Sequence, residues 1–213
     1  KTIKPDDPHC PISRLLSLEN TVGGKVQNQK NINECVSRAK QFGLSTHMDG
    51  ARLMNAALKL GVPAKTIVEK IDSVSLCISK GLGAPAGSIL AGSKDFIRKA
   101  YRVRKIVGGG MRQAGILASA GIYALDNNVH RLDNDHQNAI LLAKKLNKID
   151  KISVNPEHVE TNMVFIKIPI EAKDKIQKYC HDNEILINVE SETIRLVTHL
   201  DISKKKIDFF VEK

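Results

Sequence analysis

The alternation of short apolar runs with amphipathic segments constrains the fold of this chain most. Four apolar runs of strand length occur in the first half, at residues 14–20, 44–50, 73–79 and 87–92. Segments with apolar residues at helical spacing lie between them, at residues 31–43, 51–61 and 64–71. The first two of these segments end on a glycine, as helices commonly do. Strands and helices alternate in this way in α/β proteins, so we predict a sheet with mainly parallel strands.

The pattern changes after residue 93. Three helices are predicted next, at residues 94–106, 111–125 and 129–149. The strands predicted beyond them are at residues 152–156, 161–168, 184–189 and 193–200. The helices predicted among these strands are near residues 171–182 and from Ser203 onward. We therefore predict a large α/β domain over residues 1–128, a linking helix over 129–149 and a small α+β domain over 150–213.

The charge of the chain is strongly positive, with 33 Lys and Arg against 23 Asp and Glu and a net charge of +10. Such a charge fits either a polyanionic partner or a lysine-rich surface. Five Phe and three Tyr are too few to interleave with the basic clusters, and no nucleic-acid-binding signature occurs. No apolar run approaches the roughly 18 residues that a membrane helix needs. We expect neither a nucleic-acid nor a membrane partner.

The cysteines and histidines do not form a recognisable framework. The four cysteines lie far apart, at positions 10, 35, 77 and 180, which favours a reducing, cytoplasmic location. No pair of histidines has the H-E-x-x-H spacing of a metal site, so no metal is predicted.

Two polar residues stand at the ends of predicted strands. Asp49 closes the run 44–50 and Lys80 follows the run 73–79, and a glycine comes after each. Each has an ordinary interpretation alone, because Asp-Gly is typical of a turn and Lys-Gly of a loop. Together they match what pyridoxal phosphate needs, a lysine that forms a Schiff base and a carboxylate that holds the pyridine nitrogen protonated. Open α/β sheets bind ligands at this edge, so Lys80 and Asp49 are candidate catalytic and cofactor-binding residues.

The sequence GGGMRQ at residues 108–113 is a candidate phosphate site. Glycines that lead into a helix can expose unpaired backbone N–H groups at the positive end of its dipole. Arg112 and Lys105 could add charge-assisted hydrogen bonds. A flexible helix junction with a surface arginine is an equally good interpretation, and both stay open at this point.

Five segments, in order, resemble the low-specificity L-threonine aldolases, which are pyridoxal phosphate enzymes of fold type I. They are HMDGARLMNAA (47–57), SLCISKGLGAPAGSILAGS (75–93), RKIVGGGMRQAGILASAGIYAL (104–125), ETNMVF (160–165) and IRLVTHLD (194–201). The resemblance covers nearly the whole chain. It implies that residues 1–128 are part of the cofactor-binding large domain of an aspartate aminotransferase-like fold. It also implies cleavage of L-threonine or L-allo-threonine to glycine and acetaldehyde.

The resemblance also implies roles for individual residues. Lys80 would be the Schiff-base lysine and Asp49 the partner of the pyridine nitrogen. Arg52 would lie near the phenolic oxygen of the cofactor and the substrate, and Arg195 would bind the substrate carboxylate with its planar guanidinium. Lys105 and Arg112 would reach the cofactor phosphate across a subunit interface, in a homo-oligomer built as a dimer of dimers.

Histidines near these motifs have structural interpretations. His199 follows the motif of Arg195 without a role that the residues suggest. His47 precedes Asp49 by two positions, and a buried histidine with a hydrogen-bond partner is the favoured interpretation over support for the site.

The chain departs from the family pattern in two places. The family begins with a further segment that carries a glycine-rich phosphate-binding turn and an aromatic residue on the cofactor ring, and we expect the present chain to lack it. In ENTVGGKV (19–26), Val22 and a diglycine follow Thr21 where the family has a histidine. Two alternatives therefore stay open: a truncated, inactive chain that acts only as an interaction partner, and a related pyridoxal phosphate lyase for other β-hydroxy amino acids.

Overall fold

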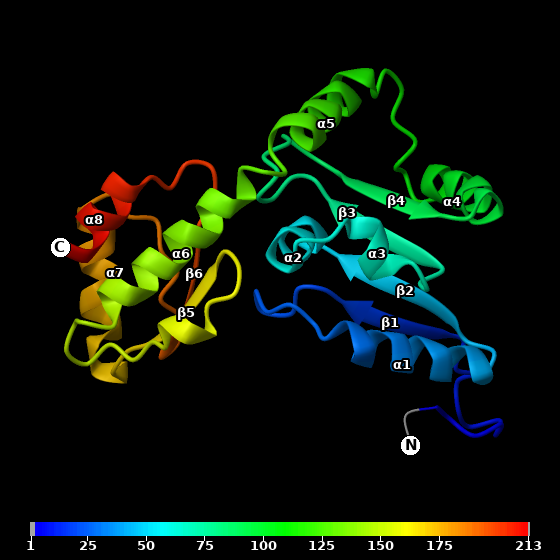
Figure 1. Cartoon of the computed structure of the whole chain (residues 1–213), viewed down its shortest axis with the longest axis horizontal. Coiled ribbons are helices and arrows are strands. Elements are labelled where there is room, and N and C mark those ends of the chain that lie inside the picture. The colour runs from blue at the N-terminus through cyan, green and yellow to red at the C-terminus, as the bar shows by residue number, and fades with distance from the viewer. Residues whose placement is uncertain (1–2, 213) are drawn as a thin grey trace.

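The computed structural model describes residues 3–212, which form two lobes built on separate sheets (Figure 1). The first lobe has a four-stranded sheet in the order β1-β2-β3-β4. Its strands are β1 (Leu15–Glu19), β2 (Ser45–Gly50), β3 (Ser73–Cys77) and β4 (Ser88–Gly92). β1, β2 and β3 are parallel, and β4 pairs with β3 in the antiparallel direction. The predicted, mainly parallel α/β sheet is thus confirmed.

Among the described residues of this lobe, three helices connect the parallel strands and two follow β4. They are α1 (Gln29–Gln41), α2 (Leu53–Leu60), α3 (Ala64–Val68), α4 (Lys94–Ile106) and α5 (Gly115–Asn127). Asn28 caps α1, because its side chain accepts hydrogen bonds from the N–H groups of Lys30 and Asn31. The apolar face of α1 buries Ile32 and Val36 against Met48 of β2. This burial fixes the crossover between β1 and β2 and so aligns the ends of the parallel strands.

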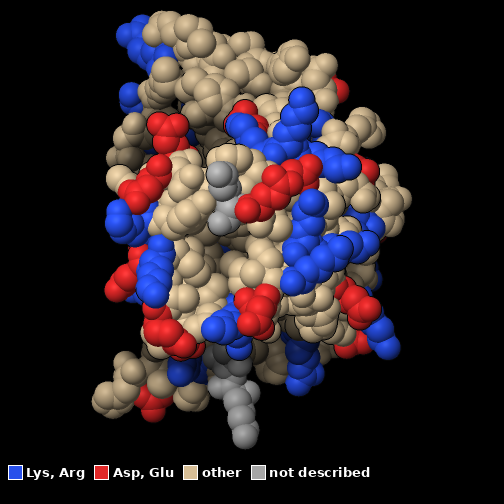
Figure 2. Space-filling model, turned by 90° about the vertical axis from the view of Figure 1, so that its left-hand side faces the viewer, with Lys and Arg blue, Asp and Glu red and all other residues tan. Residues whose placement is uncertain are grey.

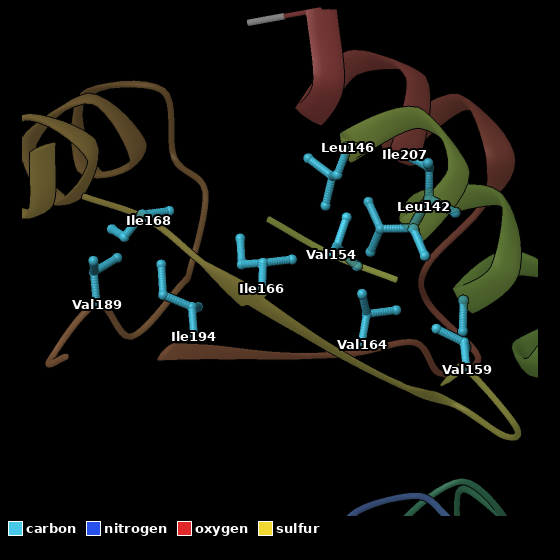
Figure 3. Packing of buried hydrophobic residues seen from close by; sticks show 12 residues of the cluster. Leu142, Leu146, Val154, Val159, Val164, Ile166, Ile168, Val189, Ile194 and Ile207 are labelled. Atoms are coloured by element: carbon cyan, nitrogen blue, oxygen red, sulfur yellow. The ribbon is translucent and has the colours of Figure 1, made fainter. Parts of the chain in front are cut away.

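The second lobe has a two-stranded antiparallel sheet and three further helices in the described chain. They are α6 (Leu132–Leu146), β5 (Met163–Lys167), α7 (Lys173–Asp182), β6 (Thr193–Val197) and α8 (Lys204–Glu212), with short 3-10 helices at Pro156–His158 and Ile170–Ala172. Apolar residues of α6, β5, β6 and α8 form one buried cluster (Figure 3). Leu146, Val164 and Ile194 each keep at most 2 % of their surface exposed, so this cluster holds the lobe together.

Two strands predicted in this lobe do not form. Residues 152–156 contribute one bridge, between Ser153 and Lys167. Residues 184–189 alternate in burial as a strand would, with Leu186 fully exposed and Val189 buried, but they have no strand partner. Gln177 instead accepts the hydrogen bond of the Val189 N–H group. The burial pattern is that of a strand, but a strand also needs a neighbour to pair with, which the sequence does not specify.

The helix predicted at residues 111–125 begins later, at Gly115. The glycines before it end α4 instead. The N–H of Gly108 donates to the carbonyl of Lys105, and that of Gly109 to the carbonyl of Arg104, at 3.2 and 2.8 Å. Gly108 has a φ of +86°, which favours glycine after a helix. The prediction that this segment leads directly into a helix was therefore wrong.

The surface carries both charged and apolar regions. Lys and Arg are interspersed with Asp and Glu on the face of the second lobe (Figure 2), as solvated helix faces would be. Large apolar side chains are exposed on α4, α5 and the segment between them: Tyr101, Ile106, Val107, Met111, Ile116, Ile122 and Tyr123. None of the helices within residues 3–212 combines the length and the apolar character needed to cross a bilayer.

Candidate functional site

The carboxyl ends of β1, β2 and β3 lie at one edge of the sheet and face the second lobe (Figure 1). Asp49 lies at this end of β2 and is exposed. It pairs in register with Ser75 of β3, and β3 ends at Cys77, so Lys80 follows on the neighbouring strand beyond the same edge. The structure thus places Asp49 and Lys80 on adjacent strand ends, where α/β sheets bind ligands.

The turn that carries Lys80 is anchored by its neighbours. Ile78, Leu82 and Ala84 are buried in a small apolar cluster with residues of α5 and α6, whereas Lys80 itself is exposed. The N–H of Gly83 donates to the carbonyl of Lys80 at 2.9 Å, with Gly83 at a φ of +74°. The apolar residues on both sides of Lys80 therefore hold its backbone in place and leave its amine accessible.

Arg52 lies just before α2 and is half-buried. Burial lowers its pKa from the usual value, the positive charge of Arg195 lowers it further, and Cys77 and Glu19 act in the opposite direction. Arg195 is exposed on β6, opposite Phe165 of β5. Two guanidinium groups from different lobes therefore repel each other at this site, and an anion bound near both would relieve the repulsion.

Buried donors without partners lie at the same edge. Among the described residues, Arg52 Nε, Asn20 Nδ2 and Thr21 Oγ1 are buried and form no hydrogen bond. Asn20 follows β1 directly, and its N–H donates to the carbonyl of Asp49 at 3.0 Å. Unpaired buried polar groups are costly, so these three suit a polar ligand with several acceptors. Sequence analysis assigned no role to Asn20 or Thr21, although both belong to the motif ENTVGGKV.

Cys77 is a further group at this edge to which sequence analysis assigned no role. It ends β3, is half-buried and lies 3.4 Å from the Ser79 hydroxyl. Burial raises its pKa, but hydrogen bonding with Ser79 and the positive charge of Lys80 outweigh burial, so the pKa is lowered overall. The positive charge of Lys80 therefore acts on the Cys77 thiol at the end of β3.

Lys105 and Arg112 are not brought to this edge within one chain. Both are exposed, Lys105 in the last turn of α4 and Arg112 in the segment before α5. Helix α4 lies at the far end of the sheet from the carboxyl ends of β1, β2 and β3 (Figure 1). The Lys105 side chain packs against Gly110, where a Cβ atom would overlap it. Within one chain, α4 therefore holds Lys105 away from the candidate site.

The histidines of the motifs have structural partners. His47 is half-buried, and its Nδ1 lies 2.8 Å from the Ser73 hydroxyl, which agrees with the structural interpretation. His199 is exposed and lies 3.5 Å from Asp201. Among residues 3–212, no group of three or more His, Cys, Asp and Glu side chains could hold a metal ion.

A cavity of about 660 Å³ lies in the second lobe, between residues 183–188, β6 and α8. Arg195 and His199 contribute to its lining, together with apolar residues such as Ile185 and Phe210. Asp49, Arg52 and Lys80 do not contribute to it. The cavity therefore shares Arg195 with the candidate site but does not include the strand ends that carry Asp49 and Lys80.

Known proteins match nearly the whole length of this chain. The low specificity L-threonine aldolase of Escherichia coli K12 is 45% identical over 205 residues, which cover 96% of this chain and 60% of that protein. Low-specificity L-threonine aldolase 1 of Arabidopsis thaliana is 43% identical, with 93% of this chain and 58% of that protein covered. The chain thus spans about 60% of the length of these relatives.

A solved structure of Leishmania major threonine aldolase superposes with a TM-score of 0.78 at 21% identity, over 97% of this chain and 61% of that one. The predicted fold type I architecture is therefore confirmed. Residues 1–169 match the Beta-eliminating lyase family. A match over so much of the sequence, on a fold shared with a threonine aldolase, means that this chain belongs to the beta-eliminating lyase family.

Proposed function

We propose that this chain provides most of the active site of a pyridoxal phosphate-dependent aldolase that cleaves L-threonine and L-allo-threonine to glycine and acetaldehyde. The observation that supports the proposal is that Asp49, Arg52 and Lys80 end or follow neighbouring strands at one sheet edge, where the positive charge of Arg195 from the other lobe also acts on Arg52. Its relatives of 45% and 43% identity carry the name of this activity. Because the chain spans only about 60% of their length, the activity of the whole protein is a proposal.

The residues at the edge fit the cofactor. The exposed amine of Lys80 would bind its aldehyde carbon, and Asp49 would hold the proton of its ring nitrogen. The unpartnered donors Arg52 Nε, Asn20 Nδ2 and Thr21 Oγ1 suit the oxygen atoms of a ligand bound beside them. When bound, pyridoxal phosphate withdraws electrons from the substrate carbon whose bond breaks.

The two arginines would orient the substrate. The α-carboxylate of a β-hydroxy amino acid would bind Arg195, which can form two parallel hydrogen bonds with it. Its negative charge would also offset the repulsion from Arg195, which adds to burial in lowering the pKa of Arg52. A carboxylate fixed in this way limits rotation of the substrate and so selects which bond at its α-carbon is broken.

The exposed apolar surface supports self-association. Tyr101, Ile106 and Val107 on and after α4, and Ile116 and Ile122 on α5, are each more than 60 % exposed. A surface of this kind marks a protein interface. In a homo-oligomer joined through it, Lys105 and Arg112 would be free to serve the cofactor phosphate of a neighbouring copy.

Addition of pyridoxal phosphate tests the proposal. The chain should develop a visible absorbance band that is lost in Lys80→Ala and retained in Lys65→Ala, a control on the exposed surface of α3. Addition of L-threonine should then yield glycine and acetaldehyde, and Arg195→Lys should raise KM because lysine lacks the two-pronged guanidinium. A band of equal strength in Lys80→Ala would refute the role of Lys80. A Lys80-dependent band without turnover would favour the truncated, inactive chain.

A further inference from the structure

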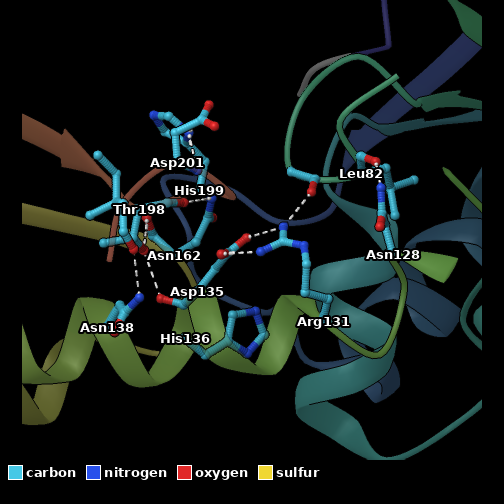
Figure 4. Close-up of polar contacts among 12 residues, drawn as sticks. Leu82, Asn128, Arg131, Asp135, His136, Asn138, Asn162, Thr198, His199 and Asp201 are labelled. Carbon is cyan, nitrogen blue, oxygen red and sulfur yellow. Dashed lines mark hydrogen bonds and ion pairs between the residues drawn. The ribbon is translucent and has the colours of Figure 1, made fainter. Parts of the chain in front are cut away.

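The first turns of α6 connect three parts of the chain that lie far apart in sequence (Figure 4). Arg131 and Asp135 lie four residues apart and form an ion pair with two hydrogen bonds, from Nη1 to Oδ1 at 2.9 Å and from Nη2 to Oδ2 at 3.0 Å. The Asp135 side chain keeps only 1 % of its surface exposed, and that of Arg131 keeps 19 %. We call these two residues the Arg131–Asp135 pair.

The Arg131–Asp135 pair contacts the turn of Lys80. Nη2 of Arg131 also donates to the carbonyl of Gly81 at 2.9 Å, directly after Lys80 in the chain. A Cβ atom at Gly81 would lie 2.8 Å from Leu132 and 3.8 Å from Asp135 Oδ2, so the turn sits tightly against α6. Asn128, just before α6, donates to the carbonyl of Leu82 at 2.7 Å. The backbone on the C-terminal side of Lys80 is thus fixed by polar side chains at the start of α6.

The same turn of α6 also holds the end of β6. The hydroxyl of Thr198 donates to the backbone carbonyl of Asp135 at 2.6 Å, and Thr198 lies three residues after Arg195. Asn162 donates to the carbonyl of Thr198 at 3.1 Å, and Thr198 is buried. One turn of helix therefore contacts both the turn of Lys80 and the strand of Arg195, which belong to different lobes.

We propose that Arg131 and Asp135 are positioning residues, which set the place of the Lys80 turn relative to the strand of Arg195. The contacts of Lys80 and Arg195 with cofactor and substrate rest on the proposed function, but the mechanical link between their segments does not. A buried ion pair adds little net stability compared with apolar residues of the same volume. Its fixed, planar, multiply bonded geometry instead restricts where the connected backbone segments can lie.

Hydrogen exchange of the cofactor-free chain tests the link directly. The variants are Asp135→Asn, which keeps the shape of the side chain, and Arg131→Lys, which keeps the charge but loses the two-pronged contact. The control is Lys145→Gln, which breaks the 2.9 Å ion pair between Lys145 of the same helix and Asp208 of α8. In both variants, amide exchange should rise about tenfold or more at residues 79–84, because the charge-assisted contact that holds the Gly81 carbonyl is weakened, and it should change less at residues 196–200, which are held by the backbone carbonyl of Asp135. In the control these segments should exchange at the original rate.

Kinetics gives a second measurement on the chain loaded with pyridoxal phosphate. In Arg131→Lys, kcat for L-threonine should fall about tenfold while KM changes less than about threefold, because the substrate still finds Arg195 but is misplaced relative to Lys80. The inference is overturned if exchange at residues 79–84 is unchanged in both variants, or if it rises equally across β5 and the C-terminal half of α6. Local exchange changes in a chain that shows no Lys80-dependent absorbance band would support the link and refute the proposed function.

Discussion

Replacement of Gly81 by alanine should strain the contact between the Lys80 turn and α6. The added methyl carbon would lie 2.8 Å from Leu132 Cδ2, well inside the roughly 3.5–4.0 Å at which carbon atoms pack best. Leu132 is fully buried among Ile78, Leu82 and Ala84, so its methyl group has no free space to move into. Overpacking of this kind costs about 1–3 kcal/mol in the free energy of unfolding. Gly81→Ala should destabilise the chain by that amount.

A double-mutant cycle isolates the contact. Leu132→Ala alone should cost about 2–5 kcal/mol, because it leaves a cavity in a dry cluster. In the double variant the methyl of residue 81 fills part of that cavity, so the total cost should be smaller than the sum of the single costs by about 0.5–3 kcal/mol. Urea unfolding followed by circular dichroism measures each value. Costs that add within about 0.5 kcal/mol would refute this packing.

Gly115→Ala is the matched control for Gly81→Ala. Apart from its chain neighbours and the backbone of its own helix, nothing lies within 4 Å of a Cβ built at Gly115, and this residue begins α5. Alanine is a better helix former than glycine, so this variant should be neutral or more stable by up to about 1 kcal/mol. An equal loss of stability in both glycine variants would assign the effect to the backbone and not to Leu132.

Two further predictions concern titration. Burial lowers the pKa of His136, so the folded chain binds fewer protons than the unfolded chain. The free energy of unfolding should therefore fall as the pH drops below 6.5, the usual pKa of histidine. Urea titrations of His136→Gln should lack this dependence. Alkylation of Cys77 by iodoacetamide should have a midpoint below pH 9.0, and Lys80→Met should raise that midpoint, because the charge of Lys80 favours the thiolate. Identical alkylation profiles with and without Lys80 would contradict the proximity of the two residues.

The sequence was sufficient to predict the first sheet because its signals are local. Apolar runs at 14–20, 44–50 and 73–79 became β1, β2 and β3 within a few residues. The glycine after each of the first two helices also marked their ends. Two predictions that depend on other parts of the chain were wrong. Residues 184–189 have a strand-like pattern but no strand to pair with, and residues 108–110 end one helix without starting the next. The predicted limits of the domains, at residues 128 and 150, stay a prediction.

The candidate site could be predicted in part for a similar reason. Asp49 and Lys80 stand at strand ends, and the topology of parallel strands alone brings such positions to one edge. Arg52 and Arg195 came from a family resemblance, and their mutual repulsion is visible only once the lobes are placed. The unpaired donors Arg52 Nε and Asn20 Nδ2 depend on burial, which no local pattern in the sequence reveals.

The first turns of α6 show why a helix pattern can hide a functional contact. Arg131 and Asp135 are spaced like an ordinary ion pair on an exposed helix face, which would contribute little. In the folded chain this pair lies between the two lobes. Arg131 donates a hydrogen bond to the Gly81 carbonyl, and the backbone carbonyl of Asp135 accepts one from the Thr198 hydroxyl. The C-terminal half of α6 is held by Leu142 and Leu146 in the core of the second lobe. Because α6 is anchored at that end, we expect a shift at Arg131 to move the Lys80 turn relative to the strand of Arg195.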